Sequence, residues 1–563
     1  MRWSYVDSAL VVVVSVYLFR APFTKVEESF SIQAIYDILN YGLFELQNYD
    51  HFQFPGVVPR SFVGPLIIAG LTKICTVVTS FAGKSREPSQ IGVQIAARAV
   101  IGLTNAVSLV YLKSSAQTMF DLGAKRREDD ETRRREQGKS VGVREPESNL
   151  STVGTWFLVF VMTGFHLMYY ASRPLPNFVV TLPLVNVATA WVLQSRYQWS
   201  ILLFALTSVV FRSEVAAMGS GIALLSVVYG KISVWKAVKF GFMGLVLGMG
   251  LSLTVDSYFW KVWCIPEVDA FIFNVLKGNA TNWGTEPFFA YFTHYLRMLF
   301  VPPTILLLNL LGFKMAPTQL KIVSLSALFH IVVMSLQPHK EWRFIVYALP
   351  PIILLGSTAA AYIWENIEIN SVRNLVFVAL LPLSPLLSLA ISWAFLYVST
   401  LNYPGGEAVA KFNDMIVANN ITNSTVHLGV PVCMTGATLF GELNHNVYGI
   451  RYDRSEKVNE LQELWPTFDY LITTEPQASL IPFSDSPTET WQLIQNTTMF
   501  SGMNSAFLTE IWSEDKNMIG VIKDSLQRPT SIVSQLSQLL DNIVVREPVF
   551  FTYKRIKEEP TQQ

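Results

Sequence analysis

Two short clusters of ionisable residues stand out in a chain that is otherwise rich in apolar residues. The first is the adjacent pair Glu27 and Glu28, in the stretch KVEESF that directly follows the first apolar segment. A carboxylate held beside a bound substrate can accept a proton from an attacking hydroxyl group, so either residue could act as a general base. The alternative is structural, because Thr24 could cap a helix while Glu27 reaches back to the Thr24 amide, as in a capping box. That alternative uses one carboxylate and leaves Glu28 unexplained.

The second cluster is the stretch QPHKEWRF, which lies between two apolar segments. It contains four ionisable side chains, those of His339, Lys340, Glu341 and Arg343. Such side chains at a membrane are costly unless water solvates them or they bind a ligand. A lysine offers a point charge and an arginine a planar fork of donors, a combination that suits a phosphate or diphosphate group. The alternative is a basic stop between two spans, which would oppose the positive-inside rule if the loop is luminal.

Other loop residues could line a substrate cavity beside these clusters. The stretch YDHFQFPGVVPRS forms a proline-containing turn at the membrane edge, although an ordinary interfacial loop would have the same pattern. Aromatic faces and carboxylates are used by sugar-binding grooves, but tryptophan is also common at membrane interfaces. Arg212 and Glu214, in FRSE, are interpreted instead as a structural ion pair. The candidates for the cavity wall are Lys25, Asp50, His51, Arg60, Arg173 and Trp260.

The elements that must position these residues are predicted to be membrane-spanning helices. Hydrophobic residues make up 51% of the 563 residues and charged residues 15%, and the mean hydropathy is +0.35. The charged fraction lies below the roughly 25% that is typical of soluble domains. Apolar segments of the length needed to cross a bilayer recur up to about residue 400. We therefore predict an all-α polytopic membrane domain over residues 1–400, with about eleven transmembrane helices.

Ten of these apolar segments are predicted to be clear spans. The region 198–230 is an uncertain eleventh, because it is long for one helix and short for two. The first segment follows Arg2 and has no small-residue cleavage motif after it, so it is predicted to remain as a signal anchor. The ten segments are residues 3–19, 61–83, 92–113, 151–171, 177–194, 233–257, 289–312, 318–337, 343–363 and 374–399.

If residues 198–230 cross once and the N-terminus is cytosolic, three loops and the C-terminal region face the lumen of the endoplasmic reticulum. Sequons at four asparagines favour the same side. In the first loop, apolar residues at helical spacing predict an amphipathic helix on the membrane surface. The loops are residues 21–60, 258–288 and 337–344, and the sequons begin at Asn279, Asn420, Asn423 and Asn496.

Two further segments differ from the membrane spans in composition. Residues 121–148 are rich in both basic and acidic residues and are predicted to form a solvated loop. Its basic residues favour the cytosol and the sequon at Asn149 favours the lumen, so its side is left open. Residues 401–563 have ordinary globular composition with strand-like runs such as YLITT and EPVFFTY. They are predicted to form a small luminal soluble domain of mixed α/β class.

The charge balance and the cysteines argue against several kinds of partner. The chain has 42 basic and 42 acidic residues, so nothing favours nucleic acid. Cys75, Cys264 and Cys433 have no metal-ligand spacing and form no disulfide framework. We expect neither a metal nor a redox cofactor.

The motifs resemble a known family, the polytopic mannosyltransferases of the endoplasmic reticulum that use dolichyl-phosphate-linked mannose and are of GT-C type. Two motifs carry the resemblance: the paired acids in KVEESF and the more specific HKEWRF. The stretches APFTKVEESF, YDHFQFPGVVPR, SRPLPNF and VDSYFW are similar to the fungal members that add an α-1,6-linked mannose to a seven-mannose lipid-linked oligosaccharide. The resemblance extends to FFTYKRIK near the C-terminus. Many members have aspartate first in the acid pair, where this chain has Glu27.

The resemblance implies a reaction and roles for the candidate residues. Mannose would pass from dolichyl phosphate mannose to Man7GlcNAc2-PP-dolichol with inversion, giving the Man8 intermediate of N-glycan precursor assembly. Glu27 would be the base, with Glu28 orienting it or contacting the acceptor. Lys340 and Arg343, with His339 beside them, would bind the donor phosphate. Members of the family need no divalent metal, and membrane spans would hold both lipid tails.

Two other classes of function remain open from the sequence. A sibling enzyme could form an α-1,2 or α-1,3 linkage in lipid-linked oligosaccharide or glycolipid-anchor synthesis, because the motifs define the chemistry better than the acceptor. A transporter or lipid flippase would also have many spans and intramembrane charges. The ionisable residues gather in loops on one side instead of near mid-membrane, and no internal repeat is evident, so the enzyme is favoured.

Overall fold

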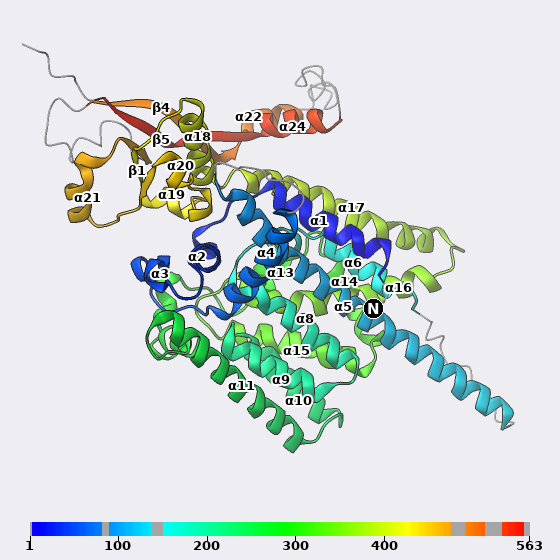
Figure 1. The fold of residues 1–563 in the computed structure, drawn as a ribbon. Helices are drawn as coiled ribbons and strands as arrows, with labels where there is room; N and C mark the ends of the chain where they lie inside the picture. The colour runs from blue at the N-terminus through cyan, green and yellow to red at the C-terminus, as the bar shows by residue number, and fades with distance from the viewer. Residues whose placement is uncertain (1–2, 81–88, 138–149, 475–489, 513–531, 557–563) are drawn as a thin grey trace, which may run out of the picture. The chain divides into compact units, whose positions relative to one another are not determined.

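The computed structural model describes residues 3–80, 89–137, 150–474, 490–512 and 532–556. The chain separates into two compact units (Figure 1). The helical unit comprises Met1–Phe19, Phe30–Cys75 and Ala96–Ser392, and the sheet unit comprises Arg20–Ser29, Thr76–Ile95 and Trp393–Gln563. The division thus differs from a single boundary at residue 400, because two N-terminal segments group with the C-terminal part of the chain.

The helical unit is built almost entirely from helices, as the apolar segments predict. A π-helical turn, Asn177–Thr181, leads into α8, and a 3-10 helix, Trp342–Ala348, leads into α16. The helices that lie wholly or largely in this unit are α1 (Tyr5–Arg20), α2 (Val26–Tyr41), α3 (Asp50–Gln53), α4 (Val63–Ser80), α5 (Ile91–Glu136), α6 (Val153–Thr163), α7 (Phe165–Tyr170), α8 (Leu182–Leu193), α9 (Tyr197–Val210), α10 (Val215–Val228), α11 (Val234–Trp260), α12 (Pro266–Phe271), α13 (Leu296–Leu299), α14 (Thr304–Met315), α15 (Thr318–Ser335), α16 (Leu349–Asn366) and α17 (Val372–Thr400).

Among the described residues, five helices are long and apolar enough to cross a membrane. A sixth is added if the bent pair Tyr291–Leu299 and Thr304–Met315 counts as one span. The helical, membrane-spanning character is therefore confirmed, whereas the count of eleven stays a prediction. The five are Ile91–Arg126, Val234–Trp260, Thr318–Ser335, Trp342–Asn366 and Asn374–Thr400.

The uncertain region 198–230 forms two helices, α9 and α10, joined by a turn that contains Arg212 and Glu214. Each helix has 14 residues and is about 21 Å long, which is short against a hydrocarbon core of about 30 Å. The length of this apolar region therefore does not decide between one helix and two. The charged FRSE stretch interrupts the apolar run, and the structure places it in the turn between the two helices instead of inside one long helix.

Hydrogen bonds define one end of the helical unit, here named the Glu365 end. The Asp7 carboxylate near the start of α1 accepts a hydrogen bond from the Lys113 ammonium at 2.8 Å. The start of α6 lies close by, because the Gln117 amide oxygen accepts the Gly154 N–H at 3.0 Å. Glu365, in the last turn of α16, accepts the Thr152 N–H at 2.7 Å and so caps α6. The start of α1, the start of α6 and the end of α16 therefore share one end.

The opposite end, named the Glu341 end, gathers the loops that contain most candidate site residues. The Trp260 indole donates to the Arg60 carbonyl at 2.9 Å and joins the loop after α3 to the end of α11. The Glu286 N–H donates to the Pro338 carbonyl at 2.9 Å and joins the loop after α12 to the α15–α16 loop. Residues 30–60, 258–288 and 337–344 thus meet at one end, while the side of the membrane stays a prediction.

The starts of α4 and α5 also lie at the Glu341 end. Before α4, the Phe62 N–H donates to Asp256, close to the end of α11, at 2.7 Å. In the first part of α5, the Asn105 amide donates to the Ala171 carbonyl, which follows α7, at 3.0 Å. Successive membrane spans begin at alternate ends of a helical domain, so α4 and α5 cannot both be ordinary spans. This differs from the prediction that residues 61–83 form an ordinary span.

The predicted solvated loop at residues 121–148 is wrong for its first half. Helix α5 runs on to Glu136, giving a helix of 46 residues. The stretch from Lys125 to Glu136 contains no glycine or proline and is dominated by arginine, lysine and glutamate, which are good helix formers. Its opposite charges at three- and four-residue spacing add further support. Residues 138–148 lie outside the described residues.

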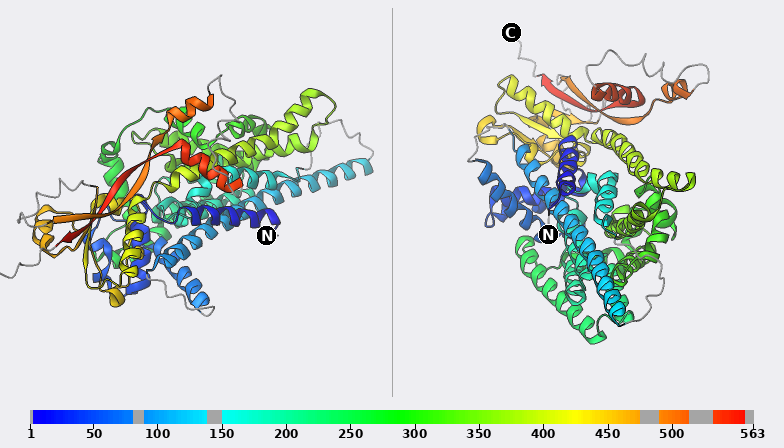
Figure 2. Two further views of the ribbon diagram at one scale, coloured as in Figure 1. Left: turned by 90° about the horizontal axis from the view of Figure 1, so that it is seen from above. Right: turned by 90° about the vertical axis from the view of Figure 1, so that its right-hand side faces the viewer.

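The sheet unit contains a five-stranded mixed sheet in the order β2-β1-β3-β5-β4. β1 pairs in parallel with β2 and β3, whereas β5 pairs antiparallel with β3 and β4. The strand-like runs YLITT and EPVFFTY lie in β3 and β5, and β4 with β5 forms a long two-stranded ribbon (Figure 2). The strands are β1 (Thr425–Leu428), β2 (Arg451–Asp453), β3 (Tyr470–Thr473), β4 (Thr490–Met503) and β5 (Val544–Ile556).

Helices cover this sheet and complete its core. The core contains Phe412 of α18 together with Val426, Ile472 and Phe550 from three strands. The central strands β1 and β3 are buried along nearly their whole length. The helices of the sheet unit are α18 (Pro404–Ala418), α19 (Val430–Met434), α20 (His445–Tyr448), α21 (Val458–Leu464), α22 (Ser505–Trp512) and α24 (Ile532–Ile543).

Glycines allow α14 and α16 to pack backbone against backbone in the helical unit. A Cβ atom added at Gly312 would lie 2.0 Å from the Leu355 carbonyl oxygen of α16. On the other side of the contact, a Cβ at Gly356 would lie 3.1 Å from the Ile305 carbonyl oxygen of α14. Neither helix can accept a larger residue there without moving its partner.

We expect Gly312→Ala to destabilise the protein by about 1–3 kcal/mol, because overpacking forces backbone shifts. Thermal unfolding of the purified protein in detergent measures the effect. The matched control is Gly250→Ala in α11, where an added Cβ meets no atom within 4 Å. Equal melting temperatures for the two variants would contradict the close contact.

Candidate functional site

The HKEWRF stretch forms the turn from α15 into the 3-10 helix before α16, and bonds to its backbone hold it in place. The Asn177 amide donates to the Arg343 carbonyl at 3.2 Å. The His330 ring lies 2.8 Å from the Phe344 carbonyl. The Tyr291 hydroxyl bonds both the N–H and the carbonyl of Glu341, at 3.3 Å and 3.2 Å. The loop is therefore fixed by its main chain, which leaves side chains available for chemistry.

Glu341 binds two cationic side chains of its own motif. The Arg343 guanidinium donates to both carboxylate oxygens, through Nη2 to Oε1 at 2.7 Å and through Nε to Oε2. The His339 Nε2 lies 3.0 Å from Oε1. Burial raises the pKa of Glu341, but the charge of Arg343 and the hydrogen bonds from Arg343 and His339 outweigh it and lower the pKa. Glu341 is therefore a firmly held anion.

Lys340 points away from this ion cluster. Its side chain is buried, and its ammonium donates to the Gln337 carbonyl at 2.5 Å and to the Glu286 carbonyl at 3.3 Å. Burial lowers the pKa of Lys340, and the nearby charge of Glu286 opposes this shift. In this structure the lysine ties the α15–α16 loop to the loop after α12. Its predicted contact with a donor phosphate stays a prediction.

Arg60 is the most accessible of the predicted cavity-wall residues. Its side chain is exposed, and within the described part of the chain its guanidinium makes no hydrogen bond or ion pair. Although the side chain is exposed, neighbouring protein groups remove part of its hydration, and this loss together with repulsion by Arg212 and Arg343 lowers the pKa of Arg60. The charges of Glu267 and Glu214 oppose the shift. Three arginines therefore lie within electrostatic range of one another. An exposed cation in such a cluster is suited to an anionic ligand.

A buried polar network lies beneath the Glu341 end. Glu214 accepts hydrogen bonds from Arg212 Nε at 2.8 Å and from the Asn177 amide at 3.0 Å. Asn177 also donates to the Tyr347 hydroxyl at 2.8 Å, while Glu267 accepts the Ser213 N–H at 2.8 Å. The predicted Arg212–Glu214 ion pair is confirmed.

Sequence reasoning did not assign this network a role in the site. Asn177 lies in the quoted stretch SRPLPNF, and Glu267 lies in the 258–288 loop. Their types and motifs were visible, but their convergence with Glu214 depends on tertiary contacts between distant segments. Only the structure brings them under the HKEWRF loop.

The other cavity-wall candidates are largely buried in packing contacts. His51 is buried, its Nε2 lies 3.1 Å from the Phe259 carbonyl, and its ring lies 4.6 Å from that of Trp260. The Asp50 N–H donates to the Asp37 carboxylate at 2.9 Å. The Arg173 guanidinium is fully buried over the Tyr169 ring at 4.2 Å and donates to its hydroxyl at 2.7 Å. These residues shape and support the Glu341 end.

The acidic pair lies at the start of α2, in the sheet unit, whereas the other candidates except Lys25 lie in the helical unit. Helix α2 begins at Val26, and the Glu28 carboxylate accepts the Lys25 N–H at 3.2 Å. The predicted capping box of Thr24 with Glu27 is therefore wrong by one residue, because the helix starts later. The acid that reaches back is Glu28.

The two glutamates consequently differ in exposure. Glu28 is buried, with 3% of its surface accessible, whereas Glu27 is exposed. Glu27 makes no hydrogen bond to any other described residue, so its carboxylate is not occupied by the helix cap. The Lys25 ammonium lies 5.9 Å from the Tyr403 ring centre, a cation–π contact within the sheet unit. Glu28 therefore caps the helix, and Glu27 remains accessible to a substrate.

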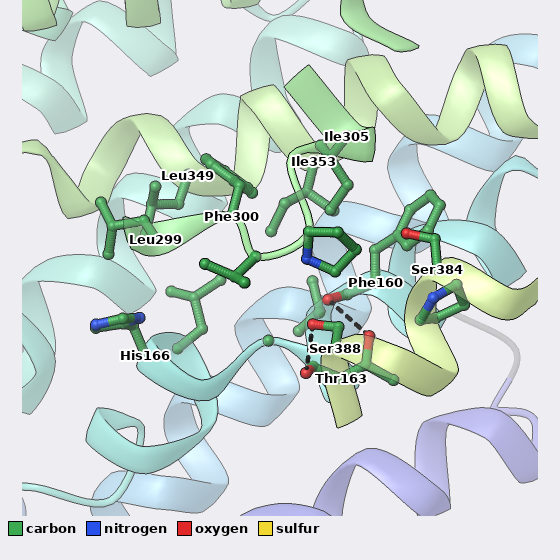
Figure 3. Close-up of a pocket in the computed structure, with 16 residues that line it drawn as sticks. Phe160, Thr163, His166, Leu299, Phe300, Ile305, Leu349, Ile353, Ser384 and Ser388 are labelled. Atoms are coloured by element: carbon green, nitrogen blue, oxygen red, sulfur yellow. Dashed lines mark hydrogen bonds between the residues drawn. The ribbon is translucent and has the colours of Figure 1, made fainter. Parts of the chain in front are cut away.

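An apolar cavity lies where two breaks between helices face α17 (Figure 3). The ring of His166, which lines the cavity, lies 5.4 Å from the Trp342 ring of the HKEWRF loop. The breaks are at Gly164 between α6 and α7 and at Pro302 between α13 and α14, whereas Pro385 lines the cavity from within the continuous helix α17. The carbonyl of Thr163, freed by the first break, accepts hydrogen bonds from the hydroxyls of Ser388 and Ser392, at 2.9 Å and 2.7 Å. The remaining lining is mostly apolar.

No group of three or more His, Cys, Asp or Glu side chains within the described ranges could hold a metal ion. The expectation that no metal is needed stays a prediction.

Comparison with known proteins identifies the class of protein that carries these features. A sequence model of the Alg9-like mannosyltransferase family matches residues 8–438. The chain is 53% identical to the Dol-P-Man:Man(7)GlcNAc(2)-PP-Dol alpha-1,6-mannosyltransferase of Saccharomyces cerevisiae, over 99% of both chains. It is 33% identical to the probable enzyme of the same name in Schizosaccharomyces pombe, over 84% of this chain and 78% of that one.

A solved structure also has a similar fold. The crystal structure of ArnT from Cupriavidus metallidurans in the apo state aligns with 87% of this chain and 95% of its own, with a TM-score of 0.50 and 11% sequence identity. At that identity the similarity concerns the fold alone.

Proposed function

The chain belongs to the Alg9-like mannosyltransferase family, and on that premise we propose that it transfers mannose from dolichyl phosphate mannose, in α-1,6 linkage, to Man7GlcNAc2-PP-dolichol. The product is the Man8 intermediate of the N-glycan precursor. The observation that carries the choice of acceptor is the full-length similarity to the Saccharomyces cerevisiae enzyme of that name. The exposed acid at the start of α2 and the cations of the HKEWRF loop supply the chemistry.

The proposed transfer is a single displacement at the anomeric carbon of the donor mannose. The 6-hydroxyl oxygen of the acceptor mannose attacks C1, and the bond from C1 to the phosphate oxygen breaks with its electron pair remaining on dolichyl phosphate. The hydroxyl proton passes to the Glu27 carboxylate, which acts as general base. Attack from the face opposite the leaving group inverts the anomeric configuration. Glu28 positions Glu27 by capping the helix that carries both.

Cationic side chains at the Glu341 end stabilise the leaving phosphate. Arg343 offers a fork of donors, and His339 lies beside it. Arg60 adds an exposed charge, and Lys340 contributes its charge while fixing the loop. These fixed cations meet the charge that develops on the phosphate, so the transfer needs no metal ion or cofactor. Exposure supports Arg60 and Arg343 as the direct contacts more than it supports the buried Lys340.

We also propose that the protein is a multi-pass membrane protein of the endoplasmic reticulum with the Glu341 end in the lumen. Separate crossings by α9 and α10, together with an α4 that does not cross, retain a total of eleven and keep the N-terminus opposite the site. The crossings are α1, α5, α6 with α7, α8, α9, α10, α11, α13 with α14, α15, α16 and α17.

The direct test supplies purified protein with dolichyl phosphate mannose and a lipid-linked seven-mannose acceptor. We expect one mannose to be added, and linkage analysis of the product should show an α-1,6 bond. The same acceptor extended beforehand by that mannose is the control and should not react. Absence of transfer, or a new α-1,2 or α-1,3 bond, would contradict the proposed function.

We expect Glu27→Gln to reduce transfer by about 10²–10⁴-fold, because the amide cannot accept the hydroxyl proton. Its melting temperature should match that of the wild type, since Glu27 is exposed and makes no cap. Glu28→Gln is the companion variant and should lose about 1 kcal/mol of stability through the weakened helix start. Activity assays and thermal unfolding separate the two effects. Near-normal turnover by Glu27→Gln would exclude it as the base.

The two ends of the helical unit should differ in glycosylation. Asn279 belongs to the loop after α12 at the Glu341 end, whereas Ser151, the hydroxyl residue of the Asn149 sequon, bonds to Glu365 at the other end. We expect Asn279 to carry a glycan in cells and the Asn149 sequon to remain unmodified. Endoglycosidase treatment of Asn279→Gln and Asn149→Gln variants measures this by mobility. The reverse pattern would place the site in the cytosol.

A further inference from the structure

The HKEWRF loop contains its own anion, and that anion occupies the groups best suited to a phosphate. Arg343 presents two parallel donors, Nη2 and Nε, to the two carboxylate oxygens of Glu341. His339 contacts one of the same oxygens at 3.0 Å. Arginine binds carboxylate and phosphate with the same forked geometry. Two oxygens of a phosphate group could therefore accept the same hydrogen bonds that the two carboxylate oxygens of Glu341 accept.

The three side chains are accessible, although their backbone is not mobile. Relative exposures are 16% for the His339 side chain, 27% for Glu341 and 23% for Arg343. The backbone of the loop is held by the Tyr291 hydroxyl at Glu341 and by the Asn177 amide at Arg343. Rotation about side-chain bonds can therefore change ionic partners without rebuilding the loop.

The surrounding charges determine how a phosphate would displace Glu341 from Arg343. Lys340 is committed to two backbone carbonyls, and Arg60 has no ion-pair partner among the described residues. A phosphate that approaches Arg60 and Arg343 meets the Glu341 carboxylate already on Arg343. Two anions on one guanidinium repel each other, and the repulsion grows as the bound lipid phosphate displaces water. Binding of the phosphate to the Nη2 and Nε fork of Arg343 therefore requires Glu341 to leave those two donors.

We propose that Glu341 is an internal stand-in for the donor phosphate, holding Arg343 and His339 in the empty site and reclaiming them when dolichyl phosphate departs. This inference rests on the proposed function. It makes Glu341 a positioning residue that contacts neither sugar. Its carboxylate keeps the two cations oriented between turnovers, and it competes with the phosphate of donor and product alike. The consequence is weaker retention of the product than free cations would give.

The test measures dolichyl phosphate as a competitive inhibitor against dolichyl phosphate mannose, with the full-length purified protein. We expect Glu341→Gln to lower the inhibition constant by about tenfold, because loss of a charged competitor frees a charge-assisted bond. The KM for the donor should fall in parallel, while kcat does not rise. A purely structural Glu341 would instead leave the inhibition constant unchanged or increase it.

Two further variants keep the test decisive. Glu341→Asp retains the charge but is one methylene shorter and cannot reach both partners, so it should lower the inhibition constant by about threefold even if Glu341→Gln fails to fold. Glu286→Gln removes a charge from the same end, where the carboxylate accepts from the Tyr295 hydroxyl at 2.8 Å. It is the matched control and should change the constant by less than about twofold.

The outcomes separate this inference from the proposed function. If the wild type transfers no mannose, the proposed function fails. If the wild type transfers mannose but folded Glu341 variants bind dolichyl phosphate no more tightly, the proposed function stands and the exchange is wrong. An equal gain in the Glu286→Gln control would also overturn it, because the effect would then reflect general charge.

Discussion

The structure of the Glu341 end depends on one amide side chain. The Asn177 amide nitrogen lies within hydrogen-bond distance of the Glu214 carboxylate, the Arg343 carbonyl and the Tyr347 hydroxyl, which share its two N–H groups. Asn177 itself is buried. An unpaired polar group there is costly, so each member of the network fixes the others. The turn between α9 and α10, the π-helical turn before α8 and the start of α16 are thereby locked to one another.

This rigidity explains how a membrane protein can keep a charged loop at its surface. The side chains of Asn177 and Tyr291 form hydrogen bonds to the main chain of HKEWRF. The Lys340 ammonium donates to two backbone carbonyls of the same region. Among the ionisable residues of the motif, Arg343, His339 and Glu341 keep partly accessible side chains, whereas Lys340 is buried. The motif is therefore divided between residues that hold the loop and residues that face a ligand, a division that its sequence does not display.

The sequence was sufficient to predict the helical membrane domain, the mixed sheet segments and the two motifs, because these depend on composition and local periodicity. It did not predict which glutamate caps α2, since a shift of one residue in the helix start exchanges their roles. Lys340 and Arg343 are both basic, and only tertiary contacts decide which is buried. Residues 198–230 were ambiguous because two short helices and one long helix have similar hydropathy. The charge density of the continuation of α5 predicts a loop, whereas its helix propensity, which prevails in the structure, favours a helix.

That continuation of α5 differs physically from every other long helix of the molecule. Between Lys113 and Glu136 it rises by about 35 Å beyond the ion pair with Asp7. Its last turns expose Arg126, Glu128, Asp129 and Arg133 to water. Packing cannot stabilise such a stretch, so its helicity rests on propensity and on attraction between charges one turn apart. Salt screens that attraction, with a screening length that falls from about 10 Å at 0.1 M to about 3 Å at 1 M. The end of α5 is therefore a salt-sensitive element attached to a membrane domain whose folding is governed by burial.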